Sequence, residues 1–224
     1  MNQESASTGA LAQGLVVDWG GVLTTNMHDS MQLWANNEQV DLDAFGRVMR
    51  QWLGPQGETE AAINPVHALE RGEIEVPHFE RHLADGLTEQ MGREFEADGL
   101  LKRLFEGFSH AEDMNALVRR TKSAGFRTGM LSNSWGNTYP DHLFDGMFDV
   151  VVISGDVGMR KPEERIYSYT QGLMELEPQE LVFVDDLMHN VEAARDFGMI
   201  GIHHVTYEQT ASEIDILFGR ELSS

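Results

Sequence analysis

The chain has 224 residues, of which 41% are hydrophobic and 24% charged, so it can bury one sizeable core and a smaller second one and is too apolar to be disordered. Its 16 basic and 37 acidic residues give a formal net charge of −21, which argues against nucleic acid or an anionic membrane as a partner. The sequence contains no run of 18 apolar residues, so it does not predict a transmembrane helix. The lack of cysteine excludes disulfides, thiolate metal sites and a cysteine nucleophile.

The first 13 residues, MNQESASTGALAQ, have neither a basic start nor a long apolar stretch. They do not resemble a secretory signal, and we expect residues 1–13 to be disordered. Together with the lack of cysteine, this favours a cytoplasmic protein. Because the acidic surface repels a phosphorylated metabolite, any phosphate site must carry local positive charge.

Residues 15–25 (LVVDWGGVLTT) place an apolar run directly before a carboxylate, Asp18, and two glycines, Gly20 and Gly21. Such a run predicts a strand that is buried on both faces. The glycines allow a sharp turn or a close approach to a ligand just beyond it. Ligands of open α/β sheets bind at the carboxyl ends of the strands, so Asp18 is a candidate site residue.

The next part of the chain shows helical spacing of apolar residues and no strand pattern. The expected helical segments are residues 30–50, 58–70, 77–83 and 90–108. The sequence GPQG at 54–57 separates the helical segment 30–50 from the segment 58–70, and Pro77 suits the first turn of the helix 77–83. We therefore expect residues 28–98 to form a small all-helical cap, inserted after the first strand.

From residue 111 onward, helical and apolar strand patterns alternate. The expected helices are 111–124, 163–176, 189–197 and 207–218, the expected strands are 126–133, 150–154, 181–186 and 200–203, and 137–148 is a helix-capable loop. Alternation of this kind predicts parallel βαβ units with helices on both faces of the sheet. The expected fold is α/β, with a Rossmann-like parallel-sheet core formed by residues 14–27 and 99–224.

Polar residues follow several of these strands or begin a helix. They are Asp18, Ser132-Asn133, Arg160-Lys161 and Asp185-Asp186. Each taken alone is commonly explained by turn or helix-capping chemistry. In a parallel sheet, however, all of these positions emerge at one edge and can converge, so together they indicate a site.

In order and spacing, these motifs resemble those of the haloacid-dehalogenase superfamily over about residues 11–205. The matching stretches are DWGGVL at 18–23, LSNS at 131–134, Lys161-Pro162, and VDD at 184–186 with Asn190. The helical insert stands where that superfamily has its C1 cap. The chain looks most like the branch that includes bacterial glucose-1-phosphate phosphatases and the amino-terminal domain of soluble epoxide hydrolase. This resemblance implies a phosphatase that acts on a small phosphorylated metabolite such as a sugar phosphate.

Phosphoryl transfer requires an oxyanionic nucleophile held in line with the phosphorus, and positive charge on the phosphate oxygens. Asp18 is the candidate nucleophile, which would form an aspartyl phosphate. A Mg²⁺ ion between carboxylate and phosphate would offset their repulsion, and it prefers hard oxygen ligands. Asp18, the Gly20 carbonyl and one or both of Asp185 and Asp186 can supply these ligands. The resemblance implies that Asp186 is the direct ligand.

The candidate phosphate-binding groups are the Ser132 hydroxyl, the Asn133 amide and the charge of Lys161. Asn190 is assigned to orient Lys161 or a metal-binding carboxylate. Asn190 and Trp19, which is next to the nucleophile, are also counted among the substrate- or phosphate-binding residues, with Trp19 in the wall of the site. Nothing in the sequence predicts the oligomeric state.

The chain departs from the resembling phosphatases at Gly20, where they commonly carry a second aspartate that serves as acid and base. General acid–base catalysis is typically worth about 10² to 10⁴-fold in rate. Three alternatives follow: an active phosphatase whose acid comes from the cap, from His28 or from solvent; a weak one that favours good leaving groups; or a phosphate-binding pseudoenzyme. The resembling branch includes members with glycine here, which favours the first. A metal-independent haloacid dehalogenase is disfavoured, because it has no use for the acidic pair Asp185-Asp186.

Overall fold

The computed structural model describes residues 11–25, 27–53, 64–136, 139 and 144–224, without the side chains of 27–29 and 53. The turn expected at 54–57, the first part of the helix expected at 58–70 and half of the loop expected at 137–148 lie outside the described residues, as do residues 1–10. Residues 11–13 differ from the expectation of disorder. The main-chain N–H groups of Leu11 and Ala12 donate to the Leu217 carbonyl, and that of Gln13 donates to the Glu180 carbonyl at 2.8 Å.

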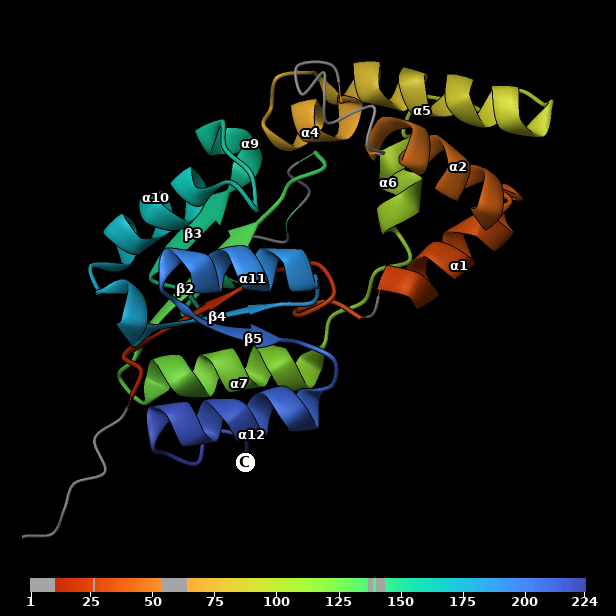
Figure 1. The fold of residues 1–224 in the computed structure, drawn as a ribbon. Helices are drawn as coiled ribbons and strands as arrows, with labels where there is room; N and C mark the ends of the chain where they lie inside the picture. Colours follow the sequence, from red (N-terminus) through yellow and green to blue (C-terminus); the bar gives the residue numbers. More distant parts are fainter. Residues whose placement is uncertain (1–10, 26, 54–63, 137–138, 140–143) are drawn as a thin grey trace, which may run out of the picture.

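A five-stranded parallel sheet, in the order β3-β2-β1-β4-β5, forms the centre of the described structure (Figure 1). Its strands are β1 (Gly14–Val17), β2 (Arg127–Ser132), β3 (Val150–Ile153), β4 (Leu181–Asp185) and β5 (Ile200–His203). Val17 of the central strand stands opposite Met130 of β2 and Val184 of β4. The predicted parallel α/β fold is confirmed.

Helices cover both faces of the sheet (Figure 1). They are α7 (Glu112–Ser123) and α12 (Tyr207–Phe218) on one face, and α10 (Glu164–Met174) and α11 (Met188–Phe197) on the other. The alternation along β1 explains this arrangement. Leu15 and Val17 pack in the cluster that contains Leu117 of α7, whereas Val16 packs in the cluster that contains Ile166 of α10.

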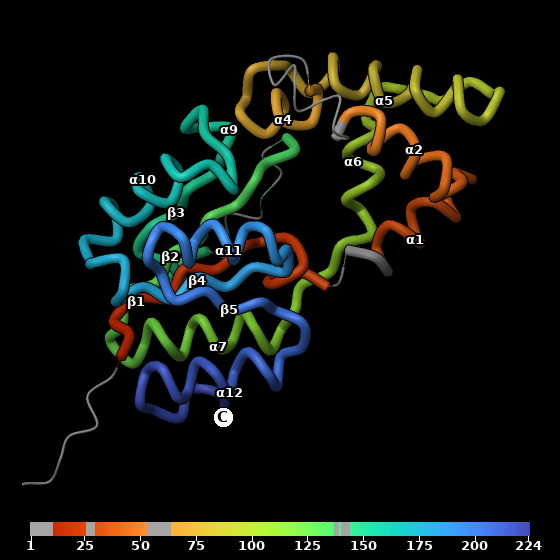
Figure 2. The backbone as a smooth tube through the Cα atoms, viewed as in Figure 1, coloured from red at the N-terminus to blue at the C-terminus, as the bar shows by residue number. Residues whose placement is uncertain are grey.

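The insert between β1 and α7 consists of helices with an apolar core of their own, at the carboxyl end of the sheet (Figure 2). They are α1 (Met27–Glu38), α2 (Leu42–Leu53), α4 (Pro65–Glu70), α5 (Val76–Met91) and α6 (Leu100–Phe105). Trp34, Phe79 and Leu83 are buried at its centre. No helix of the described residues is both long and apolar enough to cross a bilayer.

Two elements differ from the sequence prediction. The helix expected over residues 90–108 is interrupted, because α5 ends at Gly92 and α6 begins after Gly99, and both glycines have left-handed backbone, with φ of 67° and 70°. A short helix, α9 (Ser154–Val157), follows β3 directly and was not expected. Its four residues are too few to show helical spacing in a sequence. The short 3₁₀ helix η1 (Pro178–Glu180) leads into β4.

The chain leaves the sheet for the insert and returns to it at neighbouring positions. The Thr25 main-chain N–H donates to the Ser109 carbonyl at 2.7 Å, and the Ala111 N–H donates to the Leu23 carbonyl at 3.0 Å. Leucines of α6 pack in the apolar core of the insert, although they lie beyond residue 98. We therefore propose that the insert runs from residue 26 to residue 108.

Candidate active site

The predicted site residues come together at the carboxyl edge of the sheet. They are Asp18, Trp19 and Gly20 after β1, Ser132 and Asn133 at the end of β2, Lys161 before α10, and Asp185, Asp186 and Asn190 at the end of β4 and the start of α11. All of these except Asp185 line one cavity of about 870 Å³ between the sheet and the helical insert. Asp185 is fully buried behind it.

Lys161 lies at the centre of this group and is 1% exposed. Its Nζ lies 2.8 Å from Asp18 Oδ1 and 2.7 Å from Asp185 Oδ2. Burial acts against the charge of the lysine, but the two carboxylates outweigh it and hold the pKa of Lys161 above its usual value. The ammonium group therefore stays charged and links the ends of β1 and β4.

The carboxylates of Asp18, Asp185 and Asp186 crowd around this lysine, with one oxygen of each within 4.8 Å of the others. Burial raises the pKa of Asp18 to about 7; Lys161 opposes this rise, while Asp185 and Asp186 add to it. Burial and the charge of Asp185 raise the pKa of Asp186 to about 6. One ammonium group thus offsets the negative charge of the cluster only in part.

The donor set fits a hard divalent cation such as Mg²⁺, because it consists of two buried carboxylates and one partly buried carboxylate with an excess of negative charge. The backbone turn after β1 makes room for one of these carboxylates. Gly21 has a φ of +74°, and a Cβ atom at this position would lie 2.3 Å from Asp186 Oδ2. Only glycine lets the Asp186 carboxylate lie this close to the turn.

Asp185 is held by protein donors on both of its carboxylate oxygens. Asn190 Nδ2 donates to Oδ1 at 3.0 Å and to Oδ2 at 3.1 Å. The Leu187 main-chain N–H donates to Oδ1 at 2.9 Å, and Lys161 takes Oδ2. The Asn190 Oδ1 atom is buried and has no hydrogen-bond partner among the described residues. The Asn190 side chain therefore fixes the position of the Asp185 carboxylate.

Asn133 contacts the backbone of the loop that carries Lys161. Its Nδ2 donates to the Lys161 carbonyl at 3.0 Å, and its Oδ1 accepts from the Lys161 N–H at 2.8 Å. Its amide is therefore engaged on both sides and holds the lysine in place. The Ser132 hydroxyl accepts a hydrogen bond from the Tyr139 hydroxyl at 2.9 Å.

Trp19 forms one wall of the cavity. Its main-chain N–H donates to Asp18 Oδ1 at 2.7 Å, and its ring meets those of His110, Tyr139 and Phe144 edge-on. Burial raises the pKa of Tyr139 to about 12, so its hydroxyl keeps its proton. The Trp19 main chain therefore holds the Asp18 carboxylate, while its ring packs among the aromatic side chains of the wall.

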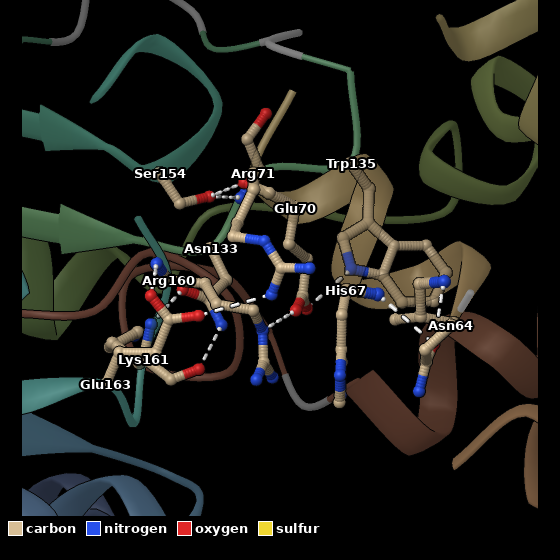
Figure 3. Close-up of polar contacts among 12 residues, drawn as sticks. Asn64, His67, Glu70, Arg71, Asn133, Trp135, Ser154, Arg160, Lys161 and Glu163 are labelled. Carbon is tan, nitrogen blue, oxygen red and sulfur yellow. Dashed lines mark hydrogen bonds and ion pairs between the residues drawn. The ribbon is translucent and has the colours of Figure 1, made fainter. Parts of the chain in front are cut away.

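The last residue of α4, Glu70, joins the insert to the loops around the site (Figure 3). Its buried carboxylate accepts from Trp135 Nε1 at 3.1 Å and from Arg160 Nε at 2.5 Å. The Ser154 hydroxyl donates to the Glu70 carbonyl at 2.5 Å. Beside it, Arg71 pairs with Glu163 at 3.2 Å. We call these contacts of Glu70 and Arg71 the α4 junction; it reaches the residue next to Lys161.

Sequence reasoning missed Glu70, Tyr139 and His67 as parts of this site. Each is a single polar residue outside the strand-end motifs, and only the folded chain brings it near them. His67 lines the cavity, and burial together with Arg160 and Arg71 lowers its pKa to about 4. The side chain of His28, which was considered as a source of the missing acid, lies outside the described residues.

A parallel α/β sheet with a carboxylate after its central strand, a buried lysine and an acidic pair defines a group of hydrolases. The chain belongs to the haloacid dehalogenase-like hydrolase family, which it matches over residues 12–198. The resemblance seen in the sequence motifs is therefore confirmed.

Several characterised proteins are similar to parts of the chain. It is 37% identical over 89 residues to bifunctional epoxide hydrolase 2 of Mus musculus, covering 36% of this chain and 16% of that protein. It is 31% identical over 110 residues to the sesquiterpene phosphatase of Aspergillus oryzae, covering 47% and 56%. It is 27% identical over 129 residues to flavin mononucleotide hydrolase 1 of Arabidopsis thaliana, covering 56% and 53%. The chain thus matches about a sixth to a half of the length of these relatives.

Solved structures share the fold over most of the chain. An HAD-like hydrolase from Porphyromonas gingivalis has a TM-score of 0.62 and 20% identity, covering 92% of this chain and 98% of that one. An HAD family enzyme from Bacteroides thetaiotaomicron, in complex with magnesium and inorganic phosphate, has a TM-score of 0.58 and 19% identity, covering 87% and 94%. At these identities, the likeness establishes the fold.

Proposed function

We propose that the protein is a Mg²⁺-dependent phosphatase of small phosphorylated metabolites, with Asp18 as the nucleophile. The observation that carries this proposal is the position of Lys161. It is buried between Asp18 and Asp185, within a cluster of three carboxylates that opens into a cavity. The phosphatases among the relatives support the same reaction.

In the first step, a carboxylate oxygen of Asp18 attacks the phosphorus, and the bond from phosphorus to the alcohol oxygen breaks. Asp18 Oδ1 is held by the Trp19 N–H and by Lys161, which leaves Oδ2 for the attack. In the second step, water attacks the phosphorus and releases Asp18 and inorganic phosphate. Because Gly20 supplies no acid, the departing alkoxide takes its proton from water, and more acidic alcohols leave faster.

The metal ligands that we propose are Asp18, Asp186 and the Gly20 carbonyl. When bound, Mg²⁺ supplies the positive charge that lets a phosphate dianion approach a carboxylate. Asp185 is less suited to direct ligation, because Lys161, Asn190 and the Leu187 N–H already occupy its oxygens. Its role in our proposal is to hold Lys161.

Lys161 and the Ser132 hydroxyl would bind the phosphate oxygens. Asn133 and Asn190 would position other site residues instead of contacting the phosphate. Asn133 fixes the backbone of Lys161, and Asn190 fixes the Asp185 carboxylate. Trp19 would line the pocket beside the phosphate. The positive charge of Lys161 also offsets, at the site, the electrostatic repulsion between a phosphate ester and a protein of net charge −21.

Hydrolysis of p-nitrophenyl phosphate with and without Mg²⁺ tests this proposal, because its leaving group needs no acid. We expect Mg²⁺-dependent release of p-nitrophenol, and a fall to background in Asp18→Asn. Asp196→Asn, an exposed carboxylate on α11, is the matched control and should keep full activity. Undiminished turnover in Asp18→Asn would refute the nucleophile.

A second measurement separates an enzyme from a phosphate-binding pseudoenzyme, the alternative raised by the lack of an acid–base carboxylate at Gly20. Beryllium fluoride with Mg²⁺ mimics an aspartyl phosphate and requires a competent Asp18. Binding of beryllium fluoride without any turnover would favour the pseudoenzyme, and binding together with turnover would favour the phosphatase.

A further inference from the structure

We infer that the cavity above Asp18 selects phosphate monoesters of large apolar alcohols over those of sugars. This inference rests on the proposed phosphatase function, because it names the substrate class of the same site. It departs from the sugar phosphate that the sequence resemblance suggests.

The side of the cavity formed by the insert is mainly apolar. Its apolar side chains are Met31 of α1, Phe45 and Met49 of α2, Val66 of α4, Leu104 and Phe105 of α6, and Phe108 just after α6. The rings of Phe105 and Phe108 pack against each other, 5.3 Å apart. These side chains line the same cavity as Asp18 and Lys161, so an ester with its phosphate at the sheet edge would place its alcohol part among them.

The size of the cavity suits a substantial organic group. Its volume of about 870 Å³ lies in the upper part of the range found for small-molecule sites, about 300–1,000 Å³. Methionine side chains adapt their shape, and phenylalanine offers a large apolar surface. This lining is suited to flexible or branched hydrocarbon.

Among the described residues, the insert places two polar side chains in the cavity, those of Glu70 and His67. Both carboxylate oxygens of Glu70 accept hydrogen bonds, from Trp135 and from Arg160. His67 has its pKa lowered to about 4 by burial and by the nearby arginines, so it is uncharged near neutral pH. A sugar would bring several hydroxyl groups against apolar side chains and lose their hydrogen bonds to water. A hydrocarbon loses none and gains about fourfold in affinity for each methylene buried.

A series of n-alkyl phosphates tests the inference cleanly, because the leaving alcohols hardly differ in acidity and only the apolar area changes. The measurement is kcat/KM with Mg²⁺ for ethyl, butyl, hexyl and octyl phosphate, with glucose 6-phosphate as a polar monoester of a primary alcohol. We expect a rise of at least about 100-fold from ethyl to octyl phosphate, and a value for glucose 6-phosphate close to that for ethyl phosphate. A flat series, or a preference for glucose 6-phosphate, would overturn the inference.

A pair of variants ties the effect to the insert. Met31→Gln combined with Met49→Gln keeps the side-chain shape but adds polarity, and it should lower kcat/KM for octyl phosphate about tenfold more than kcat/KM for ethyl phosphate. Leu33→Gln is the control, since Leu33 is on the same helix as Met31 but is 50% exposed. Equal losses in the control and in the double variant would contradict the assignment of these methionines.

Binding of octylphosphonate and ethylphosphonate, followed by tryptophan fluorescence, separates this inference from the proposed function. Trp19 and Trp135 line the cavity and report on its occupancy. Tighter binding of octylphosphonate, together with no hydrolysis of any ester, would refute the phosphatase and support the apolar site. Hydrolysis of p-nitrophenyl phosphate, together with equal binding of the two phosphonates, would refute the apolar site and support the phosphatase.

Discussion

Gly21→Ala offers a direct test of the proposed metal site. Gly21 has a φ of +74°, and an added Cβ atom would lie 2.3 Å from Asp186 Oδ2, where ordinary contact begins at 3.4 Å. The Asp186 carboxylate would therefore have to retreat by about 1 Å. Mg²⁺ binds its ligands at about 2.0–2.1 Å in a nearly ideal octahedron, so a ligand displaced this far no longer reaches the metal.

The substitution also strains the backbone, and a second glycine allows that effect to be subtracted. An alanine with left-handed backbone costs roughly 1–2 kcal/mol. Gly125, which follows α7, has a φ of +93° and nothing within 4 Å of its added Cβ atom. Gly125→Ala should therefore lose similar stability without touching Asp186. In a chain of this size, we expect both variants to melt about 2–8 °C lower than the parent.

Calorimetric titration with Mg²⁺, together with hydrolysis of p-nitrophenyl phosphate, provides the assay. We expect Gly21→Ala to bind Mg²⁺ at least about tenfold more weakly and to lose activity in proportion, whereas Gly125→Ala keeps both. Parent-like Mg²⁺ affinity in Gly21→Ala would refute the assignment of Asp186 as a ligand. Equal losses in the two variants would attribute the effect to stability alone.

Two further predictions concern the insert. Glu70→Ala leaves Arg160, whose side chain is only 13% exposed, without its carboxylate partner, and it should lower the free energy of unfolding in urea by about 2–3 kcal/mol. Glu73→Ala removes a half-exposed partner of Arg71 and should lower the free energy of unfolding by less than about 1 kcal/mol. Similar losses in the two variants would refute the importance of the α4 junction. His67 has a native pKa of about 4 against 6.5 in the unfolded chain, so between these values the unfolded state binds more protons. The contribution of His67 to stability is therefore present above pH 6.5 and is lost as the pH falls toward 4. His67→Gln should lose less stability on acidification than the parent. An unchanged dependence of the free energy of unfolding on pH would exclude His67 as the titrating group.

The strands could be predicted because the sheet is buried on both faces, so that segments such as 15–17 and 181–184 appear as unbroken apolar runs. The interruption between α5 and α6 could not. It depends on the left-handed backbone at Gly92 and Gly99, and a glycine within a helical pattern does not show which conformation it adopts. The unexpected helix α9 was missed for a different reason, its length of four residues.

For the site, motifs at strand ends were sufficient to bring Asp18, Lys161 and Asp185 together, because parallel strands point their carboxyl ends the same way. The details of pairing were beyond the sequence. Glu70 and Arg160 are 90 residues apart, and their contact depends on how the insert packs on the sheet. Asn133 was expected to face the ligand with its amide, and only the folded structure shows that amide bound to the backbone of Lys161.

The hydrogen bond between Thr25 and Ser109 places the two residues that flank the inserted segment side by side. For the sheet, this whole segment is a closed loop, and the entropy of closing a loop grows only slowly with its length, by about 0.6 kcal/mol per doubling. Insertions, deletions or exchange of the segment therefore burden the sheet very little. Since this segment supplies the apolar wall of the cavity, mutation can reshape that wall without moving the strand that precedes Asp18.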